Sequence, residues 1–151
     1  MGQLTDYQIE IMTSEQLNQI ADELDSGFKC YIHKENGNLI SIPDDLKNPG
    51  MDMEAWEEDM EKIDSEFGDY FLIEPMDSRE SFNIMEDFVE TVTEIAIHDR
   101  LAESLQRPKP FQNFKFDIDR SGSYRQKWFD YKKQRIVEWV KEQIEATGSW
   151  E

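Results

Sequence analysis

The sequence predicts an α+β fold, in which a small antiparallel sheet packs with several helices and the chain ends in one long helix. Two runs of strand-forming residues flank a turn signal within residues 28–42, and a third short apolar run covers residues 69–74. Apolar residues recur at helical spacing in most of the remaining chain. The 151 residues fit one domain, residues 1–151, with room for a mobile N-terminal stretch of about 12 residues.

The first helix is predicted to start at Thr13 or Ser14. Thr13 followed three residues later by Gln16 is typical of a capping box. Gly27 is expected to end this helix. Its core-facing stripe, at i, i+3, i+4 and i+7, consists of Leu17, Ile20, Ala21 and Leu24.

A β-hairpin follows in the segment FKCYIHKENGNLISIP, because Asn36-Gly37 between two strand-forming runs suits a type I′ turn. Both faces of this hairpin are partly apolar, so both are expected to be partly covered. The predicted pairing places Cys30, Ile32 and Leu39 on one face, and Tyr31, His33, Ile40 and Ile42 on the other.

An acidic amphipathic helix is predicted after the connector PDDLKNPG, and it ends at Gly68. The run from Asp69 to Glu74 is expected to form a third strand beside the hairpin. The core-facing stripe of the acidic helix consists of Met53, Trp56, Met60, Ile63 and Phe67.

Helices fill the remainder of the predicted fold. Asp77 and Glu80 can cap the next one, and PFQNFKFDI is expected to be a short helix with Phe111 and Phe114 facing inward. The last helix is predicted from near Ser123 to about Ala146. The core stripes of these helices are Phe82, Met85, Phe88, Val89 and Val92, then Ile95, His98, Leu101, Ala102 and Leu105, and finally Phe129, Ile136, Val140 and Ile144.

The charge is distributed unevenly. The net charge of −18 disfavours contact with phosphate backbones and anionic lipid. Residues 1–104 hold 6 Lys and Arg against 27 Asp and Glu, whereas residues 105–151 hold 10 against 7. A nucleic-acid site would therefore have to lie in the last third. The start of the chain lacks the features of a signal peptide, and no apolar run approaches the roughly 20 residues that span a bilayer. We expect a cytoplasmic protein without membrane association.

Three segments of the chain resemble a family of small bacterial proteins, an uncharacterised protein family of the UPF type. They are FLIEPMDSRESFNIMEDFVETV, PFQNFKFDI and YRQKWFDYKKQRIVEWVKEQI, which carry IEPM…R…MEDF, F-x-x-F-K and W-F…R motifs. The resemblance covers most of the chain from about residue 14 onward and implies a single domain. It brings no established activity, cofactor or catalytic residue. Lys132-Lys133 stands where the resemblance leads us to expect a basic–acidic pair.

The stretch FDIDRSGSYRQKW has the opening of a calcium-binding loop. Asp117, Asp119, Ser121 and Gly122 match its first positions, but the last position, which needs a bidentate Glu, is Trp128. The sequence therefore favours a helix–turn–helix junction, and whether the two aspartates bind a cation stays open.

The terminal helix carries a second stripe that alternates aromatic and basic residues: Trp128, Lys132, Arg135 and Trp139. Such a stripe could stack bases and hold phosphates. It could equally pack at the edge of the core, with the basic stems covering aromatic faces. We favour docking of this helix on the acidic portion of the same chain.

No convergent catalytic set is apparent in the sequence. His33 and His98 lack metal spacing, and the single cysteine, Cys30, excludes an intrachain disulfide and a multi-cysteine zinc site. No cofactor or metal is predicted, and the oligomeric state is left open.

We expect a non-enzymatic acidic interaction or adaptor domain that binds a protein with a basic patch. Nucleic-acid binding through the terminal helix is the alternative, and an enzyme with an unrecognised carboxylate or histidine site is a second alternative. The candidate binding residues are Arg79, Glu86, Lys115, Trp128, Lys132, Arg135 and Trp139.

Overall fold

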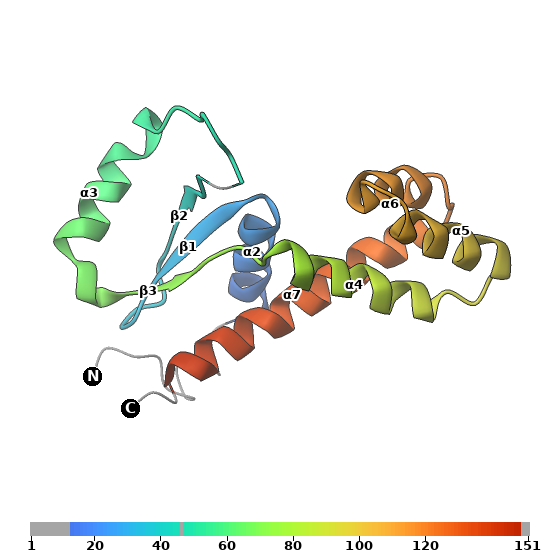
Figure 1. The fold of residues 1–151 in the computed structure, drawn as a ribbon. Helices are drawn as coiled ribbons and strands as arrows, with labels where there is room; N and C mark the ends of the chain where they lie inside the picture. Colours follow the sequence, from blue (N-terminus) through green and yellow to red (C-terminus); the bar gives the residue numbers. More distant parts are fainter. Residues whose placement is uncertain (1–12, 46, 149–151) are drawn as a thin grey trace. The chain divides into compact units, whose positions relative to one another are not determined.

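The structure, a computed structural model, describes residues 13–45 and 47–148, so the predicted mobile stretch at residues 1–12 lies outside the described residues. The fold is α+β, as predicted, with a three-stranded antiparallel sheet and a long C-terminal helix (Figure 1). Its elements, in chain order, are α2 (Ser14–Asp25), β1 (Phe28–His33), β2 (Leu39–Pro43), η1 (Glu54–Trp56), α3 (Glu57–Ser65), η2 (Phe67–Asp69), β3 (Tyr70–Ile73), α4 (Ser78–Thr91), α5 (Ile95–Gln106), α6 (Pro110–Ile118) and α7 (Tyr124–Gly148).

The chain divides into two compact units. The sheet unit consists of Met1–Pro75 and Ile136–Glu151, and the helical unit consists of Met76–Arg135. Helix α7 contributes residues to both units. Whether they unfold together as a single domain stays a prediction.

Helix α2 of the sheet unit forms as its capping signal predicts. The Thr13 hydroxyl accepts the backbone N–H of Gln16 at 3.1 Å, and the Gln16 side chain accepts the backbone N–H of Thr13 at 2.8 Å. The four apolar residues of the predicted stripe are all buried. They pack on the central strand β1, where Cys30 and Ile32 have no exposed surface.

The three strands lie in the order β2-β1-β3, and β1 pairs antiparallel with both neighbours. Ile32 pairs with Leu39, and Cys30 pairs with Ser41. Paired residues lie on the same face, so Cys30, Ile32 and Leu39 share one face and the predicted faces are confirmed. On the opposite face Ile42 is buried as well. The sheet is therefore partly covered on both sides, as the alternation of apolar residues predicted.

The predicted type I′ turn is wrong. Such a turn needs positive φ at both central residues, but among the described non-glycine residues only Lys109 has a positive φ, whereas Gly37 adopts 74°. A longer loop closes at His33, whose backbone N–H donates to the Asn38 carbonyl at 2.8 Å. The Asn36 side chain accepts the backbone N–H of Asn38 and stabilises this loop. The register is shifted by two residues, which leaves each side chain on its predicted face.

Helix α3 packs less completely than its periodicity predicts. Ile63 is buried, and the Trp56 ring contacts Phe28 edge-on with centroids 6.0 Å apart. Met60, however, is 39% exposed. The side chain of Phe67 lies outside the described part of the chain. Within the sheet unit, α3 thus buries Ile63 and leaves Met60 partly exposed.

Cys30 provides a test of the packing between α2 and β1. Burial raises the pKa of its thiol to about 12, a shift that a hydrogen bond with Ser41 opposes and the charge of Glu23 reinforces. Because the thiolate is the reactive form, we expect native protein at pH 8 to react with a disulfide reagent on the order of 10³ times more slowly than a free cysteine. Absorbance of the released thiolate measures this rate. Reaction should become fast in denaturing urea, and a fast reaction of the native protein would contradict the packing.

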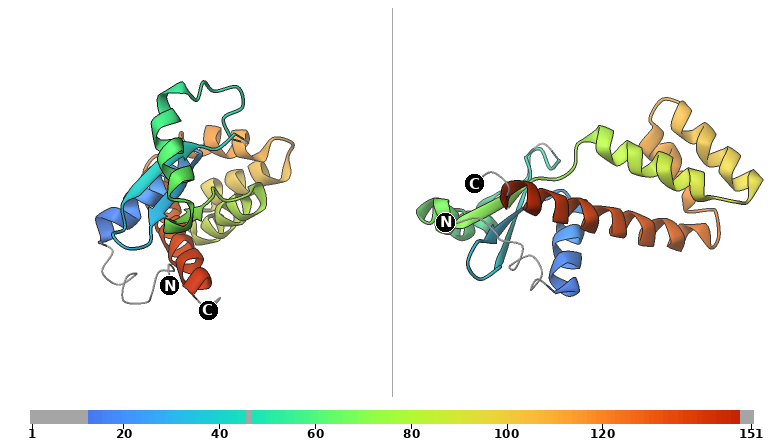
Figure 2. Two further views of the ribbon diagram at one scale, coloured as in Figure 1. Left: turned by 90° about the vertical axis from the view of Figure 1, so that its left-hand side faces the viewer. Right: turned by 90° about the horizontal axis from the view of Figure 1, so that it is seen from below.

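The helical unit has a core of its own. In it α4, α5 and α6 pack side by side (Figure 2). Asp77 caps α4, since its carboxylate accepts the backbone N–H of Glu80 at 2.8 Å. The first half of α7 adds Trp128 to this core. The buried members of the cluster are Ile84, Met85, Phe88, Val89, Val92, Leu101, Phe114, Ile118 and Trp128.

Two apolar residues of this unit do not face the core as predicted. Ile95 begins α5 and is 75% exposed, and Phe111 in the first turn of α6 is 42% exposed. Both stand at helix starts, and the Phe111 ring contacts Phe82 edge-on with centroids 6.4 Å apart. Phe114 is buried, as predicted.

No helix in the described part of the chain combines the length and the apolar character that a membrane crossing requires.

Candidate functional site

The aromatic–basic stripe on α7 is largely engaged inside the molecule. In the helical unit, Trp128 is 7% exposed and its ring lies 4.8 Å from that of Phe114 and 5.3 Å from that of Phe88. The Lys132 ammonium lies 5.6 Å from the Trp128 ring centroid. Trp139, in the sheet unit, is half-buried. The indole of Trp128 is therefore a core residue and is not available to stack a nucleic-acid base.

Arg135 is tied to the acidic part of the sequence. Its guanidinium donates at 2.8 Å to the Asp87 carboxylate on α4 and at 2.8 Å to the Tyr131 hydroxyl. These hydrogen bonds raise the pKa of Arg135, Asp87 contributing most. Within the helical unit, this ion pair is the kind of contact expected if the terminal helix docks on acidic residues.

The other predicted binding residues are dispersed. Arg79 and Glu86 are exposed on α4, and they form no ion pair with each other in the described structure. Lys115, on α6, forms an ion pair with Asp119 at 3.3 Å. Of the seven predicted residues, six lie on α4, α6 and α7 of the helical unit, and Trp139 lies in the sheet unit.

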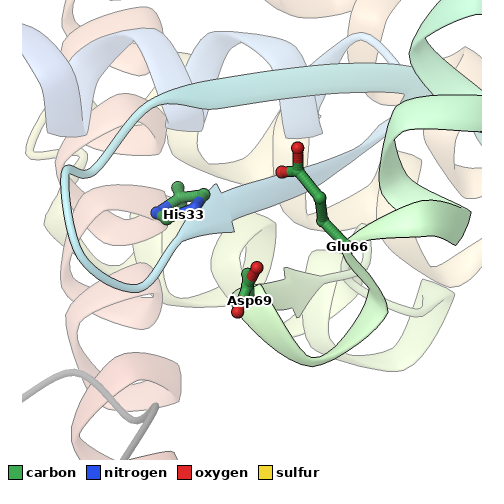
Figure 3. Close-up of side chains that lie close together, drawn as sticks. All are labelled: His33, Glu66 and Asp69. Atoms are coloured by element: carbon green, nitrogen blue, oxygen red, sulfur yellow. The ribbon is translucent and has the colours of Figure 1, made fainter.

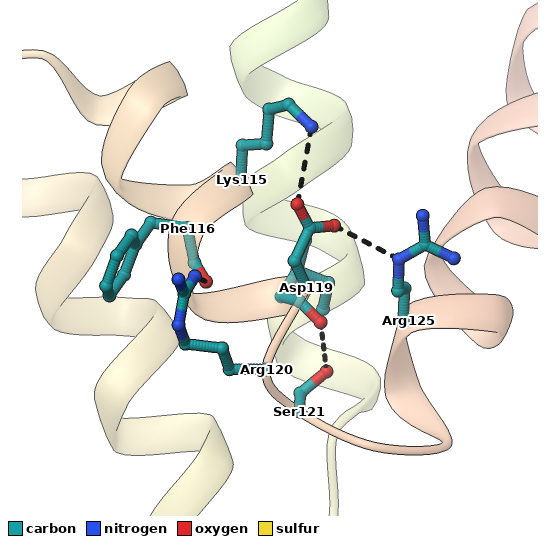
Figure 4. A network of polar contacts seen from close by, with 7 residues as sticks. Lys115, Phe116, Asp119, Arg120, Ser121 and Arg125 are labelled. Atoms are coloured by element: carbon teal, nitrogen blue, oxygen red, sulfur yellow. Dashed lines mark hydrogen bonds and ion pairs between the residues drawn. The ribbon is translucent and has the colours of Figure 1, made fainter.

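The stretch with the opening of a calcium-binding loop is a junction between α6 and α7, as the sequence favours (Figure 4). Asp117 accepts a hydrogen bond from the buried hydroxyl of Ser104, on α5. The Asp119 carboxylate faces Lys115 at 3.3 Å and Arg125 at 3.2 Å. Partial burial raises the pKa of Asp119, but the hydrogen bonds from these two cations outweigh it and hold the pKa below its usual value. The two carboxylates therefore have different partners within the protein.

A cationic and aromatic surface surrounds this junction. The Arg120 guanidinium lies 3.5 Å from the centroid of the Phe116 ring, and Phe116 is 57% exposed. On α7, the Arg125 guanidinium lies 4.7 Å from the centroid of Phe129, and Lys132 approaches the same ring at 5.8 Å. We call Lys115, Phe116, Arg120, Arg125, Phe129 and Lys132 the α6–α7 face.

A second cluster lies at the end of the sheet, where His33, Glu66 and Asp69 each offer a possible ligand atom within 4.8 Å of the others (Figure 3). The backbone N–H of Glu35 donates to His33 Nδ1 at 3.2 Å. The neutral ring then carries its proton on Nε2. A histidine that binds a metal normally donates a hydrogen bond from its other ring nitrogen. His33 Nδ1 accepts a hydrogen bond instead, so the arrangement fits a hydrogen-bonded histidine better than a metal ligand.

Sequence reasoning missed this cluster because its members are far apart in the chain. They meet because β3 pairs with β1, where His33 lies opposite Tyr70, and the backbone N–H of Lys34 donates to the Asp69 carbonyl at 2.9 Å. Burial, and then the hydrogen bond with Glu66 and the nearby carboxylates, raises the pKa of Tyr70. The cluster of His33, Glu66 and Asp69 could be found only from the register in which β3 pairs with β1.

His98, on α5, forms an exposed pair with Asp99. His98 Nδ1 lies 3.1 Å from Asp99 Oδ1, and both side chains face solvent. Nothing around this pair in the described residues assigns it a chemical role.

The α3 helix forms an acidic ridge in the sheet unit. Residues 52–66 contain eight Asp and Glu against one Lys. Met60 stands between Glu57, three residues before it, and Asp64, four residues after it, and all three are exposed. We call Glu57, Met60 and Asp64 the α3 ridge.

Comparison with known proteins agrees with the resemblance found in the sequence. The model of "Uncharacterised protein family (UPF0158)" matches residues 9–148. A curated UPF0158 protein of Pseudomonas aeruginosa is 28% identical over 130 residues, which cover 85% of this chain and 80% of that protein. No solved structure matches the chain.

Proposed function

The chain belongs to the uncharacterised protein family UPF0158, and from its own surface we propose that it is a non-enzymatic interaction domain whose α3 ridge binds a basic, amphipathic segment of another protein. The observation that carries the proposal is an acidic helix whose apolar stripe is only partly buried. Of the described residues in that stripe, Ile63 is buried, whereas Met60 keeps 39% of its surface exposed.

The charge of the sheet unit favours a basic partner. Residues 1–75 and 136–151 hold 23 Asp and Glu against 5 Lys and Arg, whereas residues 76–135 hold 11 of each. The full net charge of −18 therefore belongs to the sheet unit. A potential of this sign attracts cationic segments, accelerates their association and repels phosphate backbones.

The α3 ridge offers a partner both charge and apolar contact. Met60 is flexible and polarisable, so it can adapt to aliphatic side chains of different shapes. Glu57 and Asp64 lie on either side of it and can receive lysine or arginine. An amphipathic helix with basic residues beside an apolar stripe is the complementary ligand. A cytoplasmic location belongs to this proposal, since a free buried thiol suits a reducing compartment.

The experiment measures binding of full-length protein to two fluorescent peptides of equal length and charge. One is an amphipathic Lys/Leu helix, and the other has its leucines replaced by serine. We expect the amphipathic peptide to bind more tightly, and Met60→Ser combined with Glu57→Gln and Asp64→Asn to weaken it about tenfold, which is about 1.4 kcal/mol.

The matched control is Glu142→Gln with Glu145→Gln, which removes two exposed charges from α7 in the same unit. It should change the affinity less than about threefold, because surface charges away from the contact act mainly on the association rate. Equal weakening by the control, or equal binding of both peptides, would show non-specific charge attraction and reject the ridge as the site.

A further inference from the structure

We infer that the helical unit binds single-stranded nucleic acid through the α6–α7 face, with the stacked Phe116 and Arg120 side chains as the surface on which a base rests. This site lies in a different unit from the α3 ridge and takes a ligand of opposite charge, so it is independent of the proposed protein partner.

The segment that carries this face is basic although the chain is acidic. Residues 105–135 hold nine Lys and Arg against three Asp and Glu. Each of the three carboxylates is engaged: Asp117 with Ser104, Asp119 with Lys115 and Arg125, and Asp130 with Gln126. At an ionic strength near 0.1 M, charges farther away than about 10 Å are largely screened. Close contact with a phosphate chain therefore depends on these local cations.

The aromatic side chains supply a second kind of contact. Phe116 is 57% exposed, although burial of a phenylalanine contributes about 1.5–3 kcal/mol to folding. The guanidinium carbon of Arg120 lies 3.5 Å from the centroid of this ring. Arg120 Nη1 donates a hydrogen bond to the Phe116 carbonyl at 2.8 Å (Figure 4). The hydrogen bond fixes the guanidinium beside the ring. A planar cation on a planar ring is a suitable stacking surface for a base.

The same pairing recurs on α7. Arg125 covers the half-buried ring of Phe129, and Lys132 approaches that ring from the following turn. Asp119 joins the two helices by its ion pairs to Lys115 and Arg125. Cations and aromatic rings thus alternate from α6 onto α7.

This alternation favours a single strand over other anions. A single strand exposes phosphates together with the flat faces of its bases, and both kinds of contact are then used. A duplex keeps its base faces stacked inside, so only its phosphates could meet the α6–α7 face. An acidic peptide would bind the cations and leave the stacked pair without a partner. The stacking residue is therefore Phe116, not Trp128 of the terminal helix, whose ring is in the core.

The test measures fluorescence anisotropy of labelled single-stranded RNA and DNA of mixed sequence, about 16 nucleotides long, with full-length protein at about 50 and 200 mM salt. The same oligonucleotide as a duplex, and polyglutamate as a competitor, complete the comparison. We expect the single strands to bind more tightly than the duplex, polyglutamate to compete poorly, and affinity to fall with salt.

Three variants identify the site. Phe116→Leu keeps an apolar side chain and removes the aromatic face, and Arg120→Lys keeps the charge and removes the plane. Each is expected to weaken binding of the single strand about tenfold, within the range for loss of one base stack. Lys62→Gln removes one positive charge from α3 and should leave binding unchanged.

Absence of binding at low salt would overturn the inference. So would equal affinity for the duplex, efficient competition by polyglutamate, or wild-type binding by Phe116→Leu. Because Phe116 and Arg120 are exposed, the variants should keep the helical circular dichroism of the parent. A variant that loses this signal is replaced by Phe116→Met, for which the same loss of stacking is expected.

Discussion

Replacement of Trp128 by alanine is expected to lower the free energy of unfolding of the helical unit by about 3–5 kcal/mol, the usual cost of removing a buried tryptophan. The ring is 7% exposed and packs against Phe88 of α4 and Phe114 of α6. Its removal deletes the aromatic contacts that α7 makes with α4 and α6. Because small domains have unfolding free energies of about 5–15 kcal/mol, this is a large fraction of the total.

Urea denaturation followed by far-ultraviolet circular dichroism measures the effect without using tryptophan fluorescence, which the substitution itself alters. Phe116→Ala is the matched control in the same unit, since it removes an aromatic ring that is 57% exposed. We expect the control to cost less than about 1 kcal/mol. A larger loss for Phe116→Ala than for Trp128→Ala would contradict the assignment of Trp128 to the core.

The second large effect is expected in the sheet unit, where Ile32→Ala should lower the free energy of unfolding by about 2–5 kcal/mol. Ile32 has no exposed surface and lies on the central strand, paired with Leu39 on one side and Phe71 on the other. Truncation leaves a cavity between the sheet and its cover, and the surrounding strands can collapse into it only in part.

Leu72→Ala is the control for this substitution. It removes a similar number of carbon atoms from the same sheet, but Leu72 lies on the edge strand β3 and is 38% exposed. A cost below about 1.5 kcal/mol is expected. Equal losses for the two variants would mean that β1 is not the buried central strand.

Together, Trp128→Ala and Ile32→Ala test the prediction of a single domain. If the chain is one cooperative domain, each variant lowers the midpoint of one common transition. If the two units unfold separately, each variant shifts only the transition of its own unit. Thermal unfolding followed by calorimetry distinguishes these results, and the second would reject the single-domain prediction.

Local patterns predicted the elements that local interactions determine. Thr13 and Gln16 specify the start of α2 through their own side chains, and the stripe behind them is buried as expected. The hairpin was predicted in the right place, but its turn was not. A type I′ turn needs positive φ at both Asn and Gly. Here the Asn36 side chain stabilises a longer loop instead.

Burial depends on distant residues, which periodicity does not reveal. The stripe predicted around α3 includes the buried Ile63, but Met60, three residues before it, is 39% exposed. Phe111 was wrongly expected to face inward: its ring contacts Phe82 edge-on but stays 42% exposed. Trp128 was ambiguous in the sequence, since a core tryptophan and a stacking tryptophan on a helix look alike until Phe88 and Phe114 are placed beside it.

The candidate sites were the hardest features to predict. Phe116 lies on α6 and Arg120 lies in the turn after it, but the aspartates between them matched the opening of a calcium-binding loop. The His33 cluster depends on a strand pairing that joins residues more than thirty positions apart. By contrast, the family was identified from short motifs, because such motifs need no knowledge of the fold.

The division of charge between the units has a consequence in mild acid. The isoelectric point is near 4.4, a pH at which about half of the carboxylates are protonated. The helical unit, with as many bases as acids, is then cationic, while the sheet unit is still anionic. A molecule with zero net charge but two oppositely charged units attracts its own copies, so turbidity near this pH should be suppressed by added salt and should reverse on return to neutrality.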